Sequence, residues 1–368
     1  MTLRRKILGS IALVLVVGLA SLAYSISHDA ACGTAPALAD KAVAMRAIAY
    51  RCYGPPEVLK LETLAKPTPA DDELLVRVHA ASLNPLDWHY MRGTPYLVRL
   101  DTGFGRPDNP RLGVDFAGTV EAVGRNVTRF KPGDEVFGGK RGAFGEYVAV
   151  REARGVALKP PNMSFEQAAA VPIAALTALQ ALRDKGHLQP GQKVLINGAS
   201  GGVGTFAVQI AKALGAEVTG VCSTRNLELV RSIGADHVID YTHEDFTRDP
   251  QHYDLIVDTV GSHGLSEYRR VLTPRGALVI VGGPSNGNWI GPLTGLIEAY
   301  MLAPFVSQGL KPMLAELNKE DLALLAELMQ NGKVTPVIDR RYPLAETAAA
   351  LRYLETGHAR GKVIINID

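Results

Sequence analysis

Cysteine is scarce in this 368-residue chain, and its spacing predicts no special use for it. Cys32, Cys52 and Cys222 form no Cys-x-x-Cys pair and show none of the spacings of a metal site. We therefore expect neither a disulfide framework nor a cysteine-rich zinc site. All three should be isolated thiols that pack like small apolar side chains.

Aromatic residues and net charge are also low, at 6% of the chain and +2. The Lys and Arg residues are scattered, which indicates an ordinary solvated exterior and no nucleic-acid surface. The length is typical of two domains, each with a sizeable core.

A long apolar run occurs at the start of the chain. Three basic residues precede Ile7–Ala23, which has no charge. We expect this run to be a single-pass membrane anchor, in preference to a cleaved signal peptide, followed by a flexible linker to residue 45. The basic residues favour a folded part outside the membrane, whereas a soluble nicotinamide cofactor is expected inside the cell, so the side of the membrane stays open. Another alternative is that translation starts at Met45.

Short alternating segments with glycine turns follow from Arg46 to about residue 165. Arg46–Tyr50, Leu74–Ala80, 113–124 and 143–150 read as strands of a small β-barrel.

Strands alternate with helices in the next part of the chain. Ser164, followed three residues later by Gln167, has the form of a helix start. Parallel strands of a doubly wound sheet are expected at 194–197, 217–222, 237–240, 254–258 and 277–281. A helix near Lys319–Asn331 and a closing strand at Lys362–Ile367 complete the chain.

The glycine-rich turn between the first of these strands and its helix predicts a phosphate site. Unpaired N–H groups at a helix start and the dipole there favour an anion. The expected dinucleotide-binding residues are Ala199, Ser200, Gly201, Gly202, Val203 and Gly204. Two alternatives are open. Gly198, Ser200 and Gly202 also match the nucleophile elbow of hydrolases, and the turn could be purely structural.

Ser223, Thr224 and Arg225 lie at the end of the second strand, where an NAD-specific site has an acid. Two hydroxyls and a guanidinium suit a 2′-phosphate, so we expect NADPH. The plainer interpretations are that Ser223 and Thr224 cap the following helix and that Arg225 is an ordinary exposed charge.

From about Arg46 onward the chain resembles the medium-chain dehydrogenase/reductase superfamily, in its zinc-independent, quinone-oxidoreductase-like branch. The motifs that carry the resemblance are Ser82–Asp87, Gly113–Val120, Gly133–Gly138, Asn197–Gly204, Cys222–Asn226 and Gly361–Ile365. The resemblance implies an α/β fold in which a doubly wound parallel (Rossmann) sheet is inserted into a GroES-like β-barrel catalytic domain. The implied parts are the N-terminal segment 1–45, the barrel 46–165, the cofactor domain 166–311 and a segment 312–368 that completes the barrel.

Zinc-dependent relatives have a Cys and a His at the places where this chain has Asn84 and Val114. We therefore expect no metal, because catalytic zinc needs three protein ligands. Without such a Lewis acid, alcohol oxidation is the less favoured chemistry.

The resemblance implies an NADPH-dependent reductase of quinones or α,β-unsaturated carbonyl compounds, with a small-molecule electron acceptor and a possible homodimer. The implied catalytic residues are Asn84, Asp87, Tyr90 and Tyr96, and His89 is a further candidate proton donor. The further implied cofactor residues are Thr177, Tyr241, Gly261, Gly282 and Lys362. Plainer alternatives exist for several of these residues. Asn84 or Asp87 could cap a helix or turn, Thr177 could pack in the core, and Lys362 could lie at the surface. A zinc-free alcohol dehydrogenase, a cofactor-binding protein without turnover and, least favoured, a serine hydrolase are the other functions considered.

Overall fold

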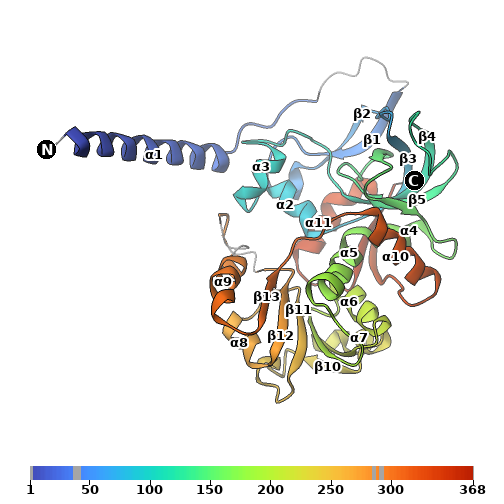
Figure 1. The fold of residues 1–368 in the computed structure, drawn as a ribbon. Helices are drawn as coiled ribbons and strands as arrows, with labels where there is room; N and C mark the ends of the chain where they lie inside the picture. Colours follow the sequence, from blue (N-terminus) through green and yellow to red (C-terminus); the bar gives the residue numbers. More distant parts are fainter. Residues whose placement is uncertain (1–2, 36–42, 284–286, 290–293, 368) are drawn as a thin grey trace.

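The computed structural model describes residues 3–35, 43–283, 287–289 and 294–367, and it contains two main sheets (Figure 1). Strands from both ends of the globular chain form one sheet, and the middle of the chain forms the other. The predicted linker therefore lies partly outside the described residues, at 36–42.

The first sheet has the order β14-β15-β3-β4-β5-β7, with β6 paired to β3. Its strands are β3 (Glu73–Ser82), β4 (Asp115–Val123), β5 (Glu135–Gly139), β6 (Tyr147–Arg151), β7 (Val156–Leu158), β14 (Ile338–Pro343) and β15 (Lys362–Asn366). A separate antiparallel pair joins β1 (Ala44–Ala49) to β2 (Lys60–Ala65). Phe116, Phe137 and Phe144 are fully buried in this part of the molecule. The last strand, β15, pairs antiparallel with β3, so the C-terminal segment and the N-terminal half share one sheet.

The second sheet is parallel and has the order β10-β9-β8-β11-β12-β13. Its strands are β8 (Lys193–Asn197), β9 (Glu217–Cys222), β10 (His237–Asp240), β11 (Tyr253–Asp258), β12 (Leu272–Ile280) and β13 (Gly309–Pro312). The five predicted strands are confirmed. β13 was missed because it is short and lies in a stretch that reads as a loop. The strand order reverses at β8, and ligands of such sheets bind where the order reverses.

Helices cover the second sheet. They are α5 (Pro172–Gln180), α6 (Gly202–Ala213), α7 (Leu227–Ser232), α8 (Leu265–Arg270) and α9 (Thr294–Leu302), while α10 (Lys319–Gln330) packs against α5 and β7. The expected start at Ser164 is confirmed at α4 (Phe165–Ala169), because Gln167 N–H donates to Ser164 Oγ at 3.2 Å. After α4 the chain continues into α5, which begins at Pro172 and is followed by a π-helical turn, η4 (Ala181–Lys185).

The remaining short elements lie at the edges of the sheets. They are α2 (Pro85–Arg92), α3 (Arg99–Thr102), α11 (Thr347–Glu355), η2 (Pro56–Val58), η3 (Tyr96–Val98), η5 (Thr224–Asn226), η6 (Phe246–Arg248), η8 (Ala303–Phe305) and η9 (Leu344–Glu346). Together with the two sheets they confirm the predicted α/β fold with a GroES-like barrel and a Rossmann sheet.

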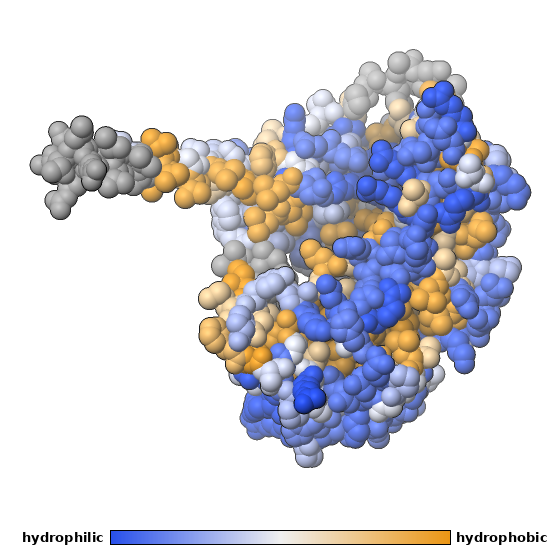
Figure 2. Space-filling model, viewed as in Figure 1, coloured by the Kyte–Doolittle hydropathy of each residue, from blue (hydrophilic) through white to orange (hydrophobic). Residues whose placement is uncertain are grey.

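The N-terminal helix α1 (Leu3–Ser27) projects from the body of the molecule (Figure 1). Several of its apolar side chains are exposed, among them Leu13, Val16 and Leu19. Much of the coloured part of this helix is orange in Figure 2. Over the part of the chain that was searched, however, no helix combines the length and the apolar character needed to cross a membrane. The predicted single-pass anchor at Ile7–Ala23 is therefore wrong.

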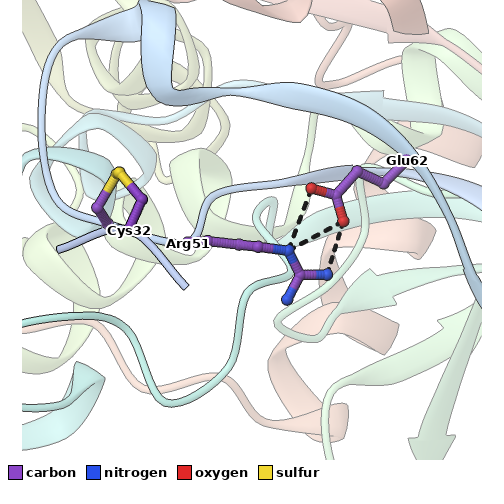
Figure 3. The surroundings of a disulfide bond; sticks show 4 residues. Cys32, Arg51 and Glu62 are labelled. Carbon is purple, nitrogen blue, oxygen red and sulfur yellow. Dashed lines mark hydrogen bonds and ion pairs between the residues drawn. A yellow bond between two sulfur atoms is a disulfide. The ribbon is translucent and has the colours of Figure 1, made fainter. Parts of the chain in front are cut away.

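A disulfide joins Cys32 to Cys52, so the prediction of three isolated thiols is wrong for two of them. Arg51, next to Cys52, forms an ion pair with Glu62 at 2.6 Å (Figure 3). The sequence spacing gave no sign of the bond, because the two cysteines meet only where the chain after α1 returns along the barrel. Cys222 is free and buried, as predicted.

The same segment is also held by Arg99, which is buried. Its guanidinium donates to the carbonyl of Ile26 at 3.0 Å and pairs with Asp29 at 2.7 Å. Residues 24–27 belong to α1, and bonds to Arg99, Cys52 and Arg51 hold residues 26–33, where a flexible linker was expected.

Candidate active site

The glycine turn follows β8 and leads directly into α6. Gly198 has a φ of +84°, which reverses the chain, and Gly201 is the N-cap of α6. No side chain caps this helix start, so the first N–H groups of a 12-residue helix have no side-chain acceptor. This arrangement fits a pyrophosphate.

Two positions in the turn explain its composition. A Cβ on Gly204 would lie 2.1 Å from the Gly198 carbonyl oxygen, so only glycine fits there. Ala199 is fully buried, and a Cβ on Gly220 of β9 would approach its methyl group to 3.0 Å. The turn therefore has Ala where the strict motif has Gly because Gly220 leaves room for the methyl group. Val203 is half-buried at the start of α6, beside Gly202.

Asn226 connects the glycine turn to the turn after β9; the sequence placed it in the motif Cys222–Asn226 but gave it no role of its own. Its amide nitrogen donates to Ser200 Oγ at 2.9 Å and to Ser223 Oγ at 3.2 Å. Its Oδ1 is buried and has no hydrogen-bond partner among the described residues. Ser200 thus bonds an amide, where the hydrolase alternative would need an imidazole.

The expected specificity residues occupy the turn between β9 and α7. Thr224 donates to the Asp240 carboxylate at 2.5 Å, and Arg225 donates to the backbone carbonyl of His358 at 2.8 Å. The sequence analysis found no acid here, but the neighbouring strand β10 brings Asp240 into the cluster. Burial opposes ionisation of Asp240, but hydrogen bonds from Thr224 and Thr242 lower its pKa.

Three of the other expected cofactor residues follow strands of the parallel sheet, and Thr177 lies in a helix. Tyr241 follows β10 and is exposed. Gly261 and Gly282 line a small cavity of about 100 Å³ beside Asp258. Thr177 is buried in α5, and its hydroxyl donates to the Ile173 carbonyl of the same helix at 2.7 Å.

Lys362 is buried, not at the surface, and lies at the centre of a polar network. Its Nζ donates to the Leu83 carbonyl at 2.8 Å and to Asn84 Oδ1 at 2.6 Å, and it lies 3.6 Å from Asp115 Oδ2. Burial lowers the pKa of Lys362 and raises that of Asp115, while the attraction between the two opposes both shifts.

Asp115 was missed in the sequence, although an acid inside an apolar strand was a usable signal. Its carboxylate also accepts from Asn84 Nδ2 at 2.9 Å, Ser82 Oγ at 3.2 Å and the Ile173 N–H at 3.1 Å. Asp115 therefore binds the amide nitrogen of Asn84, while Lys362 binds the amide oxygen of the same side chain.

Asp87 caps α2, which is the plainer alternative that the sequence left open. Its Oδ2 accepts the N–H of Asn84 at 2.7 Å, and its Oδ1 is buried without a partner among the described residues. Burial raises the pKa of Asp87 to about 8, with a further contribution from Asp115. Its carboxyl group therefore holds a proton near neutral pH.

The three candidate proton donors Tyr90, Tyr96 and His89 lie in different surroundings. The Tyr90 ring lies 4.4 Å from the Arg141 guanidinium, on the cavity side of α2. The Tyr96 ring instead packs edge-on against Trp289 at 5.0 Å, and its N–H donates to the Asn288 carbonyl. His89 donates from Nδ1 to the Thr94 carbonyl at 2.7 Å, and burial lowers its pKa.

Tyr50 is a further residue that the sequence analysis missed. It is buried, and its Oη has no hydrogen-bond partner among the described residues. Burial raises the pKa of its phenol, and the charges of Tyr53, Arg141, Tyr90 and Asp87 also act on it. Tyr50 thus belongs to the same cluster as Asp87 and Tyr90.

The two halves of the site meet at one backbone hydrogen bond. The Gly361 N–H donates to the Ser200 carbonyl at 2.9 Å. A Cβ on Gly202 would lie 3.2 Å from the Lys362 side chain. The glycine turn and the Lys362 network are therefore neighbours, as a dinucleotide reaching from one to the other requires. Among the residues searched, no three His, Cys, Asp or Glu side chains gather so that they could hold a metal ion.

Two protein families match the chain. Residues 70–161 match the alcohol dehydrogenase GroES-like domain, and residues 233–365 match the family described as zinc-binding dehydrogenase.

Individual proteins match almost the whole globular chain. A 2-methylene-furan-3-one reductase of Solanum lycopersicum is 36% identical over 340 residues, which are 88% of this chain and 79% of that protein. An NADPH-dependent alkenal/one oxidoreductase of Arabidopsis thaliana is 34% identical over 94% of this chain and 86% of its own length. The solved structure of a quinone oxidoreductase from Coxiella burnetii superposes with a TM-score of 0.78 at 32% identity, covering 88% of this chain and 100% of its own.

Proposed function

We propose a specific reaction for this chain. The chain belongs to the medium-chain dehydrogenase/reductase superfamily, in its quinone-oxidoreductase-like branch. It is an oxidoreductase that uses a nicotinamide cofactor. The proposed reaction is the NADPH-dependent reduction of quinones or α,β-unsaturated carbonyl compounds, without zinc. The observation that carries the proposal is the Gly361–Ser200 hydrogen bond, because it joins the phosphate-binding turn to the network of Lys362, Asn84 and Asp115.

NADPH is favoured over NADH by the turn after β9. The acid in this turn, Asp240, comes from the neighbouring strand, and its carboxylate already accepts from Thr224, from the Thr242 hydroxyl at 2.7 Å and from the Thr242 N–H at 3.0 Å. These bonds engage both oxygens of Asp240, which makes the carboxylate less available to ribose hydroxyls than the acid of an NAD-specific site. Arg225 is held at the same turn through His358 and supplies a guanidinium for a 2′-phosphate.

When bound, the nicotinamide supplies a hydride to an electron-poor carbon of the acceptor. The task of the chain is then to hold the reactants in line and to exclude water. Lys362, Asn84 and Asp115 are almost fully buried and mutually bonded, so they form a rigid floor for the site.

The reduced acceptor also needs a proton, and Asp87 is the group we propose to hold it. Its pKa of about 8 keeps the carboxyl group protonated at neutral pH. Tyr50 and Tyr90 lie in the same cluster and extend the set of exchangeable protons toward the cavity beside α2. A conjugated acceptor spreads the negative charge that develops during hydride transfer, which lessens the need for a Lewis acid.

The test is a panel of acceptors offered to the purified full chain with NADPH or NADH, followed by loss of the reduced-cofactor absorbance. We expect turnover with quinones and enones, a lower KM for NADPH, and no turnover in a Gly201→Val variant that blocks the phosphate turn. Saturable NADPH binding without reduction of any acceptor would contradict the proposal and favour a protein that only binds the cofactor.

A further inference from the structure

A cavity of about 610 Å³ opens beside α2, on the barrel side of the candidate site. Leu86 and Tyr90 of α2 form part of its wall, as does Val114, which directly precedes Asp115. Leu86 adjoins Asp87, so the cavity reaches the helix that carries the proposed proton. Its volume lies in the range of pockets that bind small organic ligands.

The charged side chains around this cavity are mostly positive. Four cationic side chains line it, Lys140, Arg141, Arg151 and Arg154, against a single carboxylate, that of Glu73. The Glu73 carboxylate already accepts the Ala70 N–H at 3.1 Å. A cluster of like charges at the wall of a concave site raises the local concentration of ligands of the opposite sign.

Two of these four cations have no ion-pair partner among the described residues, and a third has only a weak one. Within the described ranges, neither Lys140 nor Arg154 forms an ion pair. Arg151 lies 3.6 Å from Asp72, and both side chains are more than half exposed, so that pair is weak. Arg141 pairs with Asp101 and stacks on Tyr90 at 4.4 Å, which directs its guanidinium toward α2.

We propose that the acceptor of this enzyme carries an oxyanion group, a carboxylate or a phosphate, which binds between Lys140, Arg141 and Arg154 while its conjugated carbonyl lies against α2. This inference rests on the proposed reduction of conjugated carbonyl compounds and names a substrate class within it. Neutral quinones and enones then bind through their apolar part alone, and anionic ones gain charge-assisted hydrogen bonds from these cations.

The test compares acceptors that share one conjugated skeleton and differ in the charge of one substituent. Benzylideneacetone can carry a carboxylate, a phosphonate or a neutral carboxamide at the para position, far from the reacting carbon. At low ionic strength we expect kcat/KM of the full chain to be about tenfold higher for the carboxylate than for the carboxamide, which corresponds to about 1.4 kcal/mol. The preference should be carried mainly by KM and should shrink as salt screens the charges. A larger gain for the phosphonate would point to a phosphate, and a larger gain for the carboxylate would point to a carboxylic acid.

The variants assign the effect to the cavity. A Lys140→Ala/Arg154→Ala double variant should bring the carboxylate-to-carboxamide ratio close to one, because kcat/KM falls mainly for the carboxylate. Lys333→Ala, which removes an exposed cation after α10, is the matched control and should keep the wild-type ratio.

Two results would overturn the inference: a ratio near one in the wild-type chain, or the wild-type ratio retained in the double variant. If no acceptor of the series is reduced, the proposed function fails, and the inference is then tested by calorimetric titration of the para-carboxylate into the chain with NADPH. Binding that weakens about tenfold in the double variant would support the inference independently of turnover, and equal binding by the two proteins would overturn it.

Discussion

The Lys362 ammonium group lies 2.6 Å from Asn84 Oδ1 and thereby joins the last strand of the chain to the start of α2. The two residues are separated by 278 positions in the sequence. Asp115 completes the contact from β4, so three distant segments meet at one buried charge.

Replacing Lys362 by Met should destabilise the fold, because it leaves the Asp115 carboxylate buried without its cation. Removal of one partner of a buried pair typically costs about 3–5 kcal/mol in the free energy of unfolding. A Lys362→Met/Asp115→Asn double variant should recover part of that loss, and urea unfolding measures both. Lys159→Met removes another almost fully buried lysine, which pairs with Glu135 away from the site, and should lower stability without weakening NADPH binding. Additive losses in the double variant would contradict the pairing.

Stability should depend on pH through Asp87. Its pKa in the folded state is about 8, above its ordinary value, so the folded chain binds a proton that the unfolded chain releases. Stability from this group is present at low pH and falls as pH rises toward 8, by at most about 1.4 kcal/mol per pH unit. Asp87→Asn keeps an acceptor for the Asn84 N–H and cannot ionise, so the wild type should lose stability relative to this variant between about pH 5 and about pH 7. A difference that does not change with pH would rule out the buried, protonated carboxyl group.

Arg225→Ala should raise KM for NADPH by about tenfold and leave KM for NADH unchanged, because the lost charge-assisted contact serves only the 2′-phosphate. Arg231→Ala, which removes an exposed arginine of α7 paired with Glu228, is the control and should alter neither constant. Initial rates with the two cofactors measure the effect. The same NADPH-to-NADH ratio before and after Arg225→Ala would remove this residue from the cofactor site.

Two glycines of the turn should respond differently to alanine. Gly204→Ala places a methyl group 2.1 Å from the Gly198 carbonyl oxygen and should lower the Tm markedly. Gly201→Ala meets only that oxygen, at 3.4 Å, and has an ordinary φ of −82°, so the chain should fold normally. It should nevertheless bind NADPH at least about tenfold more weakly, because the methyl group stands where the pyrophosphate approaches. Thermal melts with and without NADPH separate the two effects, and wild-type affinity in Gly201→Ala would argue against a cofactor at this turn.

The Cys32–Cys52 bond should be detectable and stabilising. Without reductant the unfolded chain should show one reactive thiol, Cys222, and after reduction it should show three. A Cys32→Ser/Cys52→Ser variant should lose about 3 kcal/mol of stability, since the bond closes a loop of about 20 residues. Cys222→Ala serves as the control for thiol counting. Three reactive thiols before reduction would show that the bond does not form.

Local sequence determined the elements with a strong period or a fixed turn chemistry. The five parallel strands, the start at Ser164 and the glycine turn all follow from short-range rules, because backbone geometry and hydrophobic period act over a few residues. The positions of Asn84, Asp87 and Lys362 came from motifs, and the sequence also pointed to the turn at Ser223–Arg225 as the place where the cofactor would be chosen.

Tertiary structure alone decided which distant residues meet. Asp240 enters the cofactor turn from a neighbouring strand, Asn226 joins two turns, and Asp115 underlies Asn84 and Lys362. The disulfide and the buried Arg99 likewise depend on how the chain after α1 returns to the barrel. These contacts arise from long-range packing, and a single sequence carries no period or spacing that encodes them. The cationic cavity beside α2 also could not be predicted from a sequence whose net charge is only +2, because its cations come from segments that only the fold brings together.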